Sequence, residues 1–587
     1  MMPKRLSATL SVTACLFLTL GVFEPSYLYL TNKSEFKLFF PDLLLYTLFP
    51  SALLILIATA VIHALKPALN EKIVSLGLAL SFLLWLQGNI LVWQYGPLTG
   101  RPIAWSQYWH LGLIDLLVWA GFIFLSFKKS SFFYKRALTF ALGLICIQVV
   151  SISFTAVRTA SAVEGFKNYI ADDTAKFHFS TDQNVIVLIL DEFQSDCFLD
   201  IVQDDQDYAS IFDGFVYFPN ALAAYNATVL AVPALMTTRQ YTNTIPRPRF
   251  LKKAFLECSI PKVLKDRGFT VHVFPWLGLA NDSVYFDEQV ATNFKRASIP
   301  LKQKLDETLR VLDLALLRYV PHFAKKYVYN EHKWLLARYV KRAFRRVRGV
   351  EEKAPEFADL GFVRAAGANT STCIANKVFK FYHLNGPHVP LTVNRDFEYF
   401  PDIAYNKKNY EEQARASLKV CRSFLDELKK SRAYDNSLIF VIGDHGGMLS
   451  EDMYINPEGK IDRTILNCPE KRNFHFDKAR GIPLVLVKRF HARGPMKTCH
   501  APVSLLDIPS TIMSELNLDD SPFSGMSMFE VTPKSDRKRY YCAYTWRPVK
   551  SNYVDTIVMY EVSGNSWANE SWAVHAIYPP AAKPGKK

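Results

Sequence analysis

Apolar residues crowd into the first 160 positions of the chain, where they form five long stretches. The stretches cover residues 6–23, 42–65, 73–94, 109–127 and 137–157. Each is close to or longer than the roughly 20 residues with which a helix crosses about 30 Å of hydrocarbon. The first stretch follows Lys4 and Arg5, as in a signal peptide, but four more stretches come after it. We therefore predict a bundle of five retained transmembrane helices over residues 1–160.

Basic residues in the connecting loops predict how this bundle is oriented. Three alternate loops are rich in lysine and arginine: Lys4 and Arg5; Lys66 and Lys72; and Lys128, Lys129, Lys135 and Arg136. The other two loops hold only Lys33 and Lys37, and Arg101. Because basic loops stay in the cytoplasm, everything after about residue 160 is expected outside it.

Four polar residues fall in or near the apolar stretches: Gln87, Asn89, Asp115 and Gln148. One interpretation is that they form hydrogen bonds between helices. The alternative is that they contact a lipid head group.

The second half of the chain alternates short apolar runs with helical patterns. The runs cover residues 184–190, 271–274, 437–442 and 482–487, and a helical pattern covers about 410–430. Continuous apolar runs are typical of buried parallel strands, and their alternation with helices predicts a doubly wound α/β sheet. Asp191-Glu192 and Asp444-His445 follow two of these runs, at the strand ends where such sheets bind ligands.

The composition of the remaining segments predicts the domain boundaries. We expect a linker at 161–182, a catalytic domain at 183–535 with a helical insertion at about 301–350, and a C-terminal extension at 536–587. The tail at 579–587 is expected to be disordered. Within the insertion, the basic stretch Trp334–Arg348 is either a solvated helix face or an amphipathic helix on the outer leaflet.

Charge and cysteine usage narrow the class of function. The formal net charge of +15 suits a nucleic acid, an anionic membrane or an anionic substrate. The chain has no zinc-finger spacing, RNP-like motif or Walker A loop, so nucleic acid is not an expected partner. None of the nine cysteines forms a CxxC pair, which disfavours a cysteine zinc site. Disulfides suit an extracytoplasmic domain, but the sequence leaves their pairing open.

Three residues at the ends of the predicted strands have the chemistry of metal ligands. Asp191, Asp444 and His445 supply two carboxylates and an imidazole, which suit zinc, or manganese with more oxygen ligands. Thr228 precedes an apolar stretch in which Pro233 is tolerated only near a helix start. A hydroxyl there lies at the positive end of the helix dipole, and a metal ion lowers the pKa of a hydroxyl that it binds. These residues predict a metal site beside a threonine nucleophile.

The order of these motifs resembles the alkaline phosphatase and sulfatase superfamily. The resemblance is closest to its membrane-bound branch, the lipoteichoic acid synthases and lipid A phosphoethanolamine transferases, which also carry five transmembrane helices before an extracellular or periplasmic catalytic domain. It implies a sulfatase-like α/β fold and a multi-pass protein of the inner (plasma) membrane.

The resemblance also implies roles for individual residues. Thr228, five residues before Pro233, matches the threonine nucleophile of a Thr-x-x-Ser-x-Pro pattern. Glu192 matches the second acid of the sulfatase Asp-Asp pair. The implied metal ligands are Asp191, Glu192, Thr228, Asp444 and His445.

Three histidines complete the implied site. His383 and His388 resemble a transferase segment, His-x-x-Gly-Ser-His-Gly-Pro, whose histidines contact phosphate or a second metal. His475 precedes the fourth apolar run, where related enzymes carry a further histidine. We expect His383 and His388 to bind the phosphoryl oxygens, and His475 to protonate the leaving group or deprotonate the acceptor.

The chain departs from the family patterns in three ways. Ala231 stands where the pattern has serine. Asp191-Glu192 replaces the Glu-Ser of the transferases, which leaves the number of metal ions open. No Cys-x-Pro-Ser-Arg or Ser-x-Pro-Ser-Arg surrounds Thr228, so a formylglycine nucleophile cannot be made and a true sulfatase is disfavoured.

The implied function is a metal-dependent transferase, with Zn²⁺ as the expected ion and Mn²⁺, Ca²⁺ or Mg²⁺ as alternatives. It would move a phosphoethanolamine or phosphoglycerol head group from a phospholipid donor, through a phospho-threonine, to an envelope glycan or lipid. Two alternatives stay open. One is a sulfatase-like hydrolase of phosphodiesters or sulfate esters, and the other is a non-catalytic scaffold for envelope assembly.

Overall fold

The chain folds into two compact units. Unit 1 comprises Met1–Asn168 and Ser298–Lys353, and unit 2 comprises Tyr169–Ala297 and Ala354–Lys587. The computed structural model describes residues 4–33, 36, 38–95, 103, 105–159, 169–275, 286–296, 300–330, 333–348, 356–400, 403–447, 474–545 and 553–580. Residues 161–168 of the expected linker and 581–587 of the expected disordered tail therefore lie outside the described residues, whereas the rest of the linker carries β1 (Tyr169–Ala171) and β2 (His178–Ser180).

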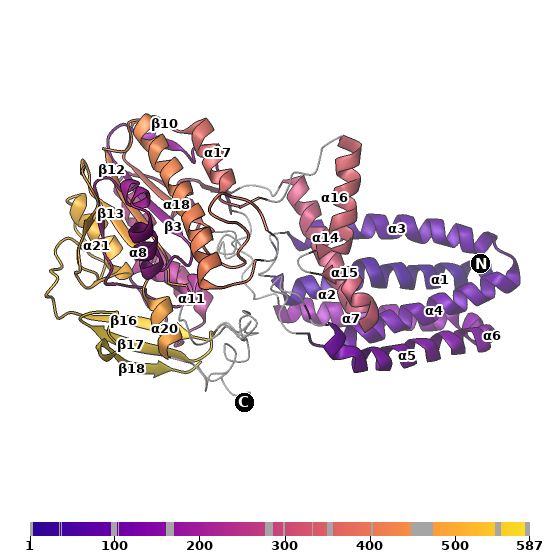
Figure 1. The fold of residues 1–587 in the computed structure, drawn as a ribbon. Coiled ribbons are helices and arrows are strands. Elements are labelled where there is room, and N and C mark those ends of the chain that lie inside the picture. Colours follow the sequence, from indigo (N-terminus) through magenta and orange to yellow (C-terminus); the bar gives the residue numbers. More distant parts are fainter. Residues whose placement is uncertain are drawn as a thin grey trace. The chain divides into compact units, whose positions relative to one another are not determined.

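Five helices of unit 1 are long and apolar enough to cross a membrane, as predicted. They run side by side in Figure 1. The spans are Lys4–Thr31, Phe40–Ala64 (α3), Pro67–Asn89 (α4), Trp105–Lys128 and Ala137–Thr159 (α7). The first span joins α1 (Lys4–Leu18) and α2 (Glu24–Thr31) through a π-helical turn, and the fourth contains α5 (Trp109–Lys128). By length and composition, the chain is a multi-pass membrane protein.

Polar residues inside the bundle form hydrogen bonds between helices. The Gln87 amide on α4 donates to Asp115 Oδ1 on α5 at 3.2 Å. The Gln148 amide on α7 donates to Thr19 Oγ1 in the first span at 3.0 Å. For these residues the hydrogen-bonding interpretation holds, and each bond ties two helices together in a region where water is scarce.

The helical insertion packs on the membrane helices and belongs to unit 1. It comprises α14 (Leu301–Tyr319), α15 (His322–Val328) and α16 (Leu335–Arg348). Glu307 on α14 accepts a hydrogen bond from the backbone N–H of Leu38 at 2.9 Å, and the Tyr319 hydroxyl donates to the Thr19 carbonyl at 2.5 Å. We predicted this segment as an insertion in the catalytic domain. The sequence carries no local signal of its contacts with distant residues of the bundle.

Asp115 fastens the start of α15 to the bundle. Its Oδ2 accepts a hydrogen bond from the backbone N–H of His322 at 2.7 Å, and its Oδ1 accepts one from Trp93 Nε1 at 2.8 Å. A carboxylate at a helix N-terminus satisfies a backbone N–H that has no partner within the helix. Asp115 therefore joins α5 to the insertion.

Unit 2 is built on a seven-stranded sheet. Its order is β14 (Lys497–Thr498), β4 (Phe215–Tyr217), β13 (Val485–Lys488), β12 (Ser437–Ile442), β3 (Asn184–Leu190), β11 (Val378–Leu384) and β6 (Thr270–Phe274). Four adjacent strands, β12, β3, β11 and the edge strand β6, run parallel to one another. In contrast, β13 runs antiparallel to β12, so the sheet is mixed.

Helices cover both faces of this sheet, which explains the continuous apolar runs. Val185, Val187 and Ile189 of β3 join one hydrophobic cluster, and the alternate residues Ile186 and Leu188 join another. The first face packs α10 (Thr228–Thr237), α11 (Arg247–Cys258), α12 (Ile260–Asp266) and α21 (Ile508–Glu515). The second packs α8 (Ser195–Asp204), α17 (Leu360–Asn369) and α18 (Lys407–Lys430). The predicted α/β fold with helices on both faces is confirmed.

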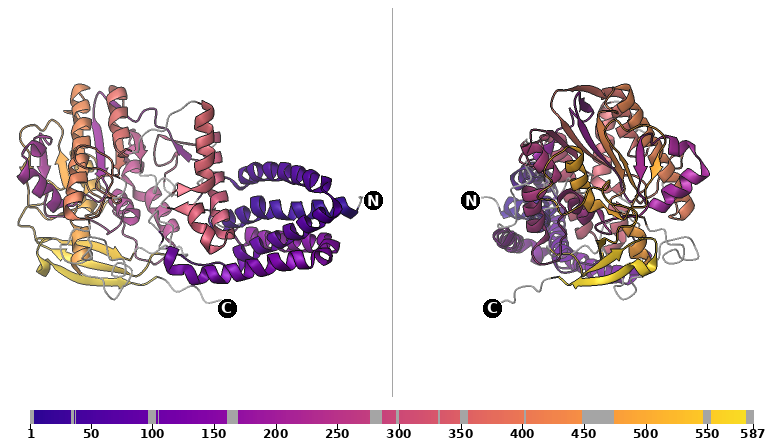
Figure 2. Two further views of the ribbon diagram at one scale, coloured as in Figure 1. Left: turned by 45° about the vertical axis from the view of Figure 1, so that its right-hand side comes forward. Right: turned by 90° about the vertical axis from the view of Figure 1, so that its left-hand side faces the viewer.

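The C-terminal extension forms a second, antiparallel sheet. Its strands are β16 (Lys538–Tyr544), β17 (Ile557–Ser563) and β18 (Trp572–Tyr578), drawn in yellow in Figure 2. Tyr541 and Ile557 join the same hydrophobic cluster as the first face of the large sheet. The described residues of the extension are therefore part of the folded unit 2.

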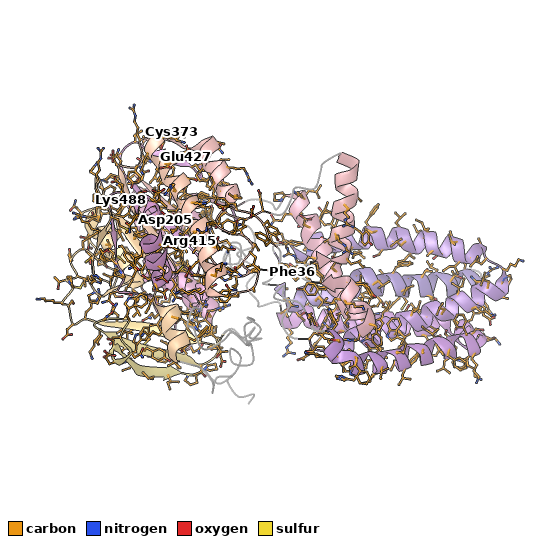
Figure 3. All side chains as sticks on the ribbon, in the orientation of Figure 1. Phe36, Asp205, Cys373, Arg415, Glu427 and Lys488 are labelled. Carbon is orange, nitrogen blue, oxygen red and sulfur yellow. The ribbon has the colours of Figure 1, made fainter. Side chains whose placement is uncertain are left out.

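The eight cysteines that the structure describes carry free thiols. Cys373 lies at the surface of unit 2 (Figure 3), whereas Cys197, Cys421 and Cys542 are buried. Burial raises the pKa of the Cys542 thiol to about 12. The buried thiols therefore behave as small apolar side chains.

Candidate active site

The site residues gather where three neighbouring parallel strands end. Asp191 directly follows β3, His383 lies near the end of β11, and Asp444 follows β12 by one residue. In the sheet register, both His383 and Ile442 stand opposite Ile189. Because the carboxyl ends of adjacent parallel strands meet at one edge, residues almost 200 positions apart become neighbours there.

Two glycines let the loop after β12 lie against other backbone segments. A Cβ at Gly443 would come within 2.3 Å of the Phe193 carbonyl oxygen, and one at Gly446 within 2.1 Å of the Ala479 carbonyl oxygen. Only glycine fits such close approaches without movement of the backbone. The glycines around Asp444-His445 therefore place these two side chains at the sheet edge.

Thr228 is the first residue of α10, and its hydroxyl points into the group of candidate ligands. Thr228 Oγ1 lies 3.3 Å from Asp191 Oδ1 and 3.2 Å from His445 Nε2. Its side chain is buried. The hydroxyl thus has the predicted neighbours and lies at the helix end where a negative charge is stabilised.

Four predicted ligand atoms lie near one another at the sheet edge. Besides the two distances to Thr228 Oγ1, His445 Nε2 lies 3.6 Å from Asp444 Oδ2 and 3.9 Å from Asp191 Oδ1. Ligands bonded to one tetrahedral ion at about 2.0–2.2 Å lie about 3.3–3.6 Å apart. These distances are close to that spacing, and the binding of one ion by Asp191, Thr228, Asp444 and His445 stays a prediction.

Asp444 supplies an independent sign of the same fit. Its side chain is 0% exposed, and Oδ1 accepts a hydrogen bond from the backbone N–H of Glu192 at 3.2 Å. Its Oδ2 finds no hydrogen-bond partner among the described residues. A buried carboxylate oxygen in that condition costs folding free energy unless a cation satisfies it.

His383 provides a second possible ligand on the other side of Asp191. Its Nε2 lies 3.2 Å from Asp191 Oδ2, and ligand atoms of Asp191, His383 and Asp444 all lie within 4.8 Å of one another. All three residues are buried. His383 was expected to bind phosphoryl oxygens, and it is thus also placed to hold a metal ion. Asp191 lies between His383 on one side and the Thr228–His445 pair on the other.

The surroundings shift the pKa values of Asp191 and Asp444 in opposite directions. Burial disfavours the charged form of Asp191, but His388, His383 and His445 hold the pKa of its carboxyl below the ordinary value. Burial and the neighbouring Asp191 raise the pKa of Asp444. Two buried acids in contact repel each other when both are ionised, and a divalent cation between them would remove that repulsion.

Glu192 pairs with Arg480 through one of its carboxylate oxygens. Arg480 Nη1 donates to Glu192 Oε1 at 2.6 Å, Arg480 Nε donates to the Asn226 carbonyl at 2.6 Å, and Arg480 Nη2 lies 3.2 Å from His445 Nδ1. Burial opposes ionisation of Glu192, but Arg480 and His388 hold the pKa of its carboxyl low. Glu192 Oε2 has no hydrogen-bond partner among the described residues, so the metal contact implied for Glu192 stays a prediction.

Arg480 was not predicted, and strand direction explains why. It is the last residue but one of α20 (Phe474–Gly481), a few residues before β13. Because β13 is antiparallel, its beginning lies at the edge where β3 and β12 end. A parallel β13 would have put Arg480 at the opposite edge, so the only available signal was a basic residue just before an apolar run.

The backbone of Glu192 is strained and is held by a buried tyrosine. Glu192 has a φ of 64°, a left-handed conformation that side-chain-bearing residues rarely adopt. The Tyr410 hydroxyl donates to the Glu192 carbonyl at 2.5 Å and accepts from the backbone N–H of Gln194 at 3.1 Å. Strain of this kind, of order 1–3 kcal/mol, turns Glu192 toward Arg480 directly after Asp191.

The turn that carries His388 is positioned by Asp359. Both carboxylate oxygens of Asp359 accept backbone N–H groups, from Asn385 and Gly386, at 2.9 Å each. Burial raises the pKa of Asp359 to about 6. His388 Nε2 then lies 3.8 Å from Glu192 Oε2. His475 lies in the first turn of α20, but its side chain is outside the described residues.

Comparisons with known proteins agree with this architecture. A family model for sulfatases matches residues 183–518. No curated protein matches the chain at a significant level.

Several solved structures align with about two thirds of the chain at low identity. The lipoteichoic acid synthase LtaP from Listeria monocytogenes is 13% identical, with a TM-score of 0.32, covering 68% of this chain and 89% of that one. A phosphonate monoester hydrolase from Silicibacter pomeroyi is 13% identical, with a TM-score of 0.38 and coverage of 65% and 87%. BT1596, a 2-O GAG sulfatase, is 12% identical, with a TM-score of 0.38 and coverage of 68% and 85%.

Proposed function

The chain belongs to the sulfatase family, and from that premise we propose that unit 2 is a metal-dependent phosphotransferase. It takes the phosphoryl head group of a membrane phospholipid, phosphoethanolamine or phosphoglycerol, onto Thr228. It then passes the group to a hydroxyl of an envelope glycan or lipid. The coarser statement, an enzyme of the sulfatase and alkaline phosphatase superfamily, follows from the family alone.

The observation that carries the proposal is the position of the Thr228 hydroxyl. Its oxygen lies 3.3 Å from Asp191 Oδ1 and 3.2 Å from His445 Nε2. A threonine at the capping position would direct its hydroxyl to a backbone N–H, but the capping residue of α10 is Ala227 and Thr228 is the first residue of the helix. A nucleophilic hydroxyl must lie within hydrogen-bond reach of the groups that activate it, and the Thr228 hydroxyl does.

In this proposal Asp191, Thr228, Asp444 and His445 hold one Zn²⁺-like ion, with His383 able to complete a second ligand set. The ion, when bound, would lower the pKa of the Thr228 hydroxyl and offset charge that develops on the phosphoryl oxygens. Arg480 keeps Glu192 in place through its hydrogen bond, and His445 Nδ1, 2.9 Å from the Gly446 carbonyl oxygen, donates to that oxygen when Nε2 binds the ion. His383 and His388 bind the phosphoryl oxygens, as the family resemblance implies.

Transfer proceeds in two balanced steps. In the first, the bond between Thr228 Oγ1 and phosphorus forms and the bond between phosphorus and the diacylglycerol oxygen breaks. The threonine proton ends on that oxygen, carried by His475 in this proposal, and diacylglycerol stays in the membrane. In the second, the acceptor hydroxyl attacks phosphorus, Thr228 Oγ1 leaves, and the proton of the acceptor returns to Thr228.

The membrane part supports a lipid donor. An odd number of spans places the chain after α7 on the side opposite the N-terminus. The basic loops favour a cytoplasmic N-terminus, so we propose that unit 2 faces the periplasm or the exterior. Anchoring an enzyme at the leaflet that holds its donor confines the search for that donor to two dimensions.

Mass spectrometry of the full chain after incubation with a lipid extract tests the proposal. We expect a phosphoethanolamine or phosphoglycerol adduct on the peptide that contains Thr228, together with released diacylglycerol. The adduct should vanish in Thr228→Ala and persist in Thr237→Ala, which changes a buried threonine at the other end of the same helix.

The remaining outcomes separate the alternatives. An adduct that decays to free phosphorylated head group at the same rate with and without a glycan or lipid acceptor identifies a hydrolase. A metal-loaded wild-type enzyme that releases no diacylglycerol and forms no adduct from any phospholipid contradicts the catalytic proposal and leaves the scaffold alternative. The set of candidate ligands stands against that last alternative, since a scaffold has no need of them.

A further inference from the structure

A small, partly open cavity lies between helices of the bundle in unit 1. It is lined by residues of α2, α4 and α7, among them Glu24, Tyr27, Trp85, Asn89 and Gln148. The cavity has a volume of about 20 Å³, room for one group the size of a water molecule. Its lining combines aromatic rings, amides and one carboxylate, which is an unusual composition for a membrane interior.

Glu24 is the charged group of this cavity, and it is incompletely paired. Its side chain is only 3% exposed. Arg318 Nη1 on α14 lies 3.2 Å from Glu24 Oε1, but the geometry makes no hydrogen bond. Glu24 Oε1 and Arg318 Nε are both buried without a hydrogen-bond partner among the residues that the structure describes. A buried ion pair with unused donors and acceptors is costly, so its retention points to a ligand.

We propose that this cavity binds the primary ammonium group of an aminophospholipid, with Glu24 as its counter-charge and Arg318 beside its phosphate. The adjacent acid and base complement the ammonium and phosphate of a zwitterionic head group. An ammonium has the size of water and fits the cavity, whereas a trimethylammonium does not. The ring of Trp85 adds cation–π attraction, while the Arg318 guanidinium lies over the Tyr27 ring, 5.3 Å from its centroid. The proposal rests on the proposed function in one respect, because it names the donor lipid as an amine-bearing one.

The position of the cavity along the helices suits a head group. Glu24 and Tyr27 lie in the last turns of the first span, Trp85 and Asn89 in the last turn or two of α4, and Gln148 at the middle of α7 with the lining residue Ser151 in its second half. Spans one, three and five run in the same direction, so these parts lie toward the same end of the bundle. That is the end from which the chain continues into unit 2, and a head group there belongs to the leaflet on that side.

Lipid binding without turnover tests the site. The full Thr228→Ala chain in detergent would be titrated with four lipids of equal acyl chains and read by native mass spectrometry: phosphatidylethanolamine, its N-monomethyl form, phosphatidylcholine and phosphatidylglycerol. We expect affinity to fall with each methyl group, by about tenfold in total, the worth of a charge-assisted hydrogen bond. Equal affinity for phosphatidylethanolamine and phosphatidylcholine would overturn the proposal.

A matched pair of variants locates the effect. In Glu24→Gln the preference for phosphatidylethanolamine should disappear. In Glu71→Gln, the same change nearer the start of α4, it should persist. If Glu24→Gln fails to fold because Arg318 is left unpaired, Glu24→Gln combined with Arg318→Gln removes both charges and should abolish the preference. An unchanged preference in the folded variant means that the cavity holds only water.

Two further arms identify the source of the amine and keep this inference apart from the enzyme assignment. Free ethanolamine should displace phosphatidylethanolamine only at far higher concentration, whereas equal potency would contradict a lipid ligand. The preference for phosphatidylethanolamine is measured in a variant that cannot turn over. It can therefore be present when no adduct forms on Thr228 in the wild type, and absent when one does.

Discussion

Two fully buried aspartates, Asp115 in unit 1 and Asp444 in unit 2, show how the same side chain serves different ends. Both are 0% exposed. Asp115 accepts hydrogen bonds from Gln87, Trp93 and the backbone of His322. Asp444 accepts one, from the backbone of Glu192, and its second oxygen has no hydrogen-bond partner in the described part of the chain.

The difference separates a structural carboxylate from a functional one. A carboxylate with donors at both oxygens repays its own desolvation and holds helices together. One with an idle buried oxygen lowers stability unless something absent from the folded chain satisfies it. In unit 2, the arrangement around Asp444 points to a metal ion.

The sharpest way to break this comparison is Asp444→Asn. We expect turnover to fall by roughly 10³-fold or more, because several kcal/mol of metal-dependent stabilisation are lost. The free energy of unfolding of unit 2 should stay within about 1 kcal/mol, since a buried unsatisfied charge is removed as well. Head-group release from phospholipid, bound metal by plasma mass spectrometry and urea unfolding measure the three quantities.

Asp205→Asn is the matched control, because Asp205 is an exposed aspartate of the same unit. It should leave metal content and turnover unchanged. Chelation of the wild type should reproduce the loss seen in Asp444→Asn, and added zinc should restore the wild type only. Full activity after exhaustive chelation would contradict the metal site.

The next largest effect is expected at Arg480. Arg480→Met leaves the Glu192 carboxylate buried without its 2.6 Å partner, which should destabilise unit 2 by about 3–5 kcal/mol. Urea unfolding of the full chain in detergent measures the loss. Adding Glu192→Gln should recover most of the stability, and a double variant as unstable as the single one would show that Arg480 acts through other contacts.

A buried lysine on β11 should make stability depend on pH. Burial lowers the pKa of Lys380 to about 7, well below the roughly 10.4 of an unfolded lysine. Between these values the unfolded chain binds more protons, so the free energy of unfolding rises with pH across the window and levels off on either side. Lys380→Met should remove a rise of the order of 3 kcal/mol between pH 7 and pH 10.

Urea titrations at pH 7 and pH 9.5 check this slope. Lys377→Met is a suitable control, because that lysine directly precedes β11 and is exposed. Identical slopes in the wild type and Lys380→Met would mean that Lys380 is charged in the fold, with its hydrogen bond to His272 offsetting its burial.

The smallest effect belongs to the satisfied aspartate. Asp115→Asn replaces one acceptor oxygen by a donor, which faces other donors and should cost about 1–3 kcal/mol. Thermal unfolding in detergent, followed at α15 by hydrogen exchange, measures it. Turnover per folded molecule should change less than twofold. A larger loss of turnover than of stability would make Asp115 functional and erase the contrast with Asp444.

The fold was predictable where residues are buried on both sides of a strand. The runs at 184–190 and 437–442 coincide with β3 and β12, because a central strand needs apolar residues at every position. In contrast, β11 was missed as a strand. Its run is broken by Lys380, which is buried and donates a hydrogen bond to His272 of β6, a pairing that no local pattern reveals.

The candidate site was predictable where a motif carries its own geometry. Close backbone approaches require glycine at positions 443 and 446. The glycines around Asp444 therefore form a pattern that can be recognised in the sequence. Arg480 depends on the direction of β13, and Asp359 acts through backbone groups of a turn 26 residues away. Residues that act through long-range backbone contacts leave no pattern in the sequence.

Chain order gives the insertion a consequence for biosynthesis. The ribosome delivers β3 and β6 before α14–α16, and β11 only afterwards. Since β11 lies between β3 and β6 in the sheet, the nascent catalytic unit cannot close until the insertion has emerged. The insertion can therefore dock on the bilayer-embedded helices before the sheet closes. Until β11 emerges, β3 and β6 lack their common neighbour, and the nascent chain needs a chaperone most at this stage of synthesis.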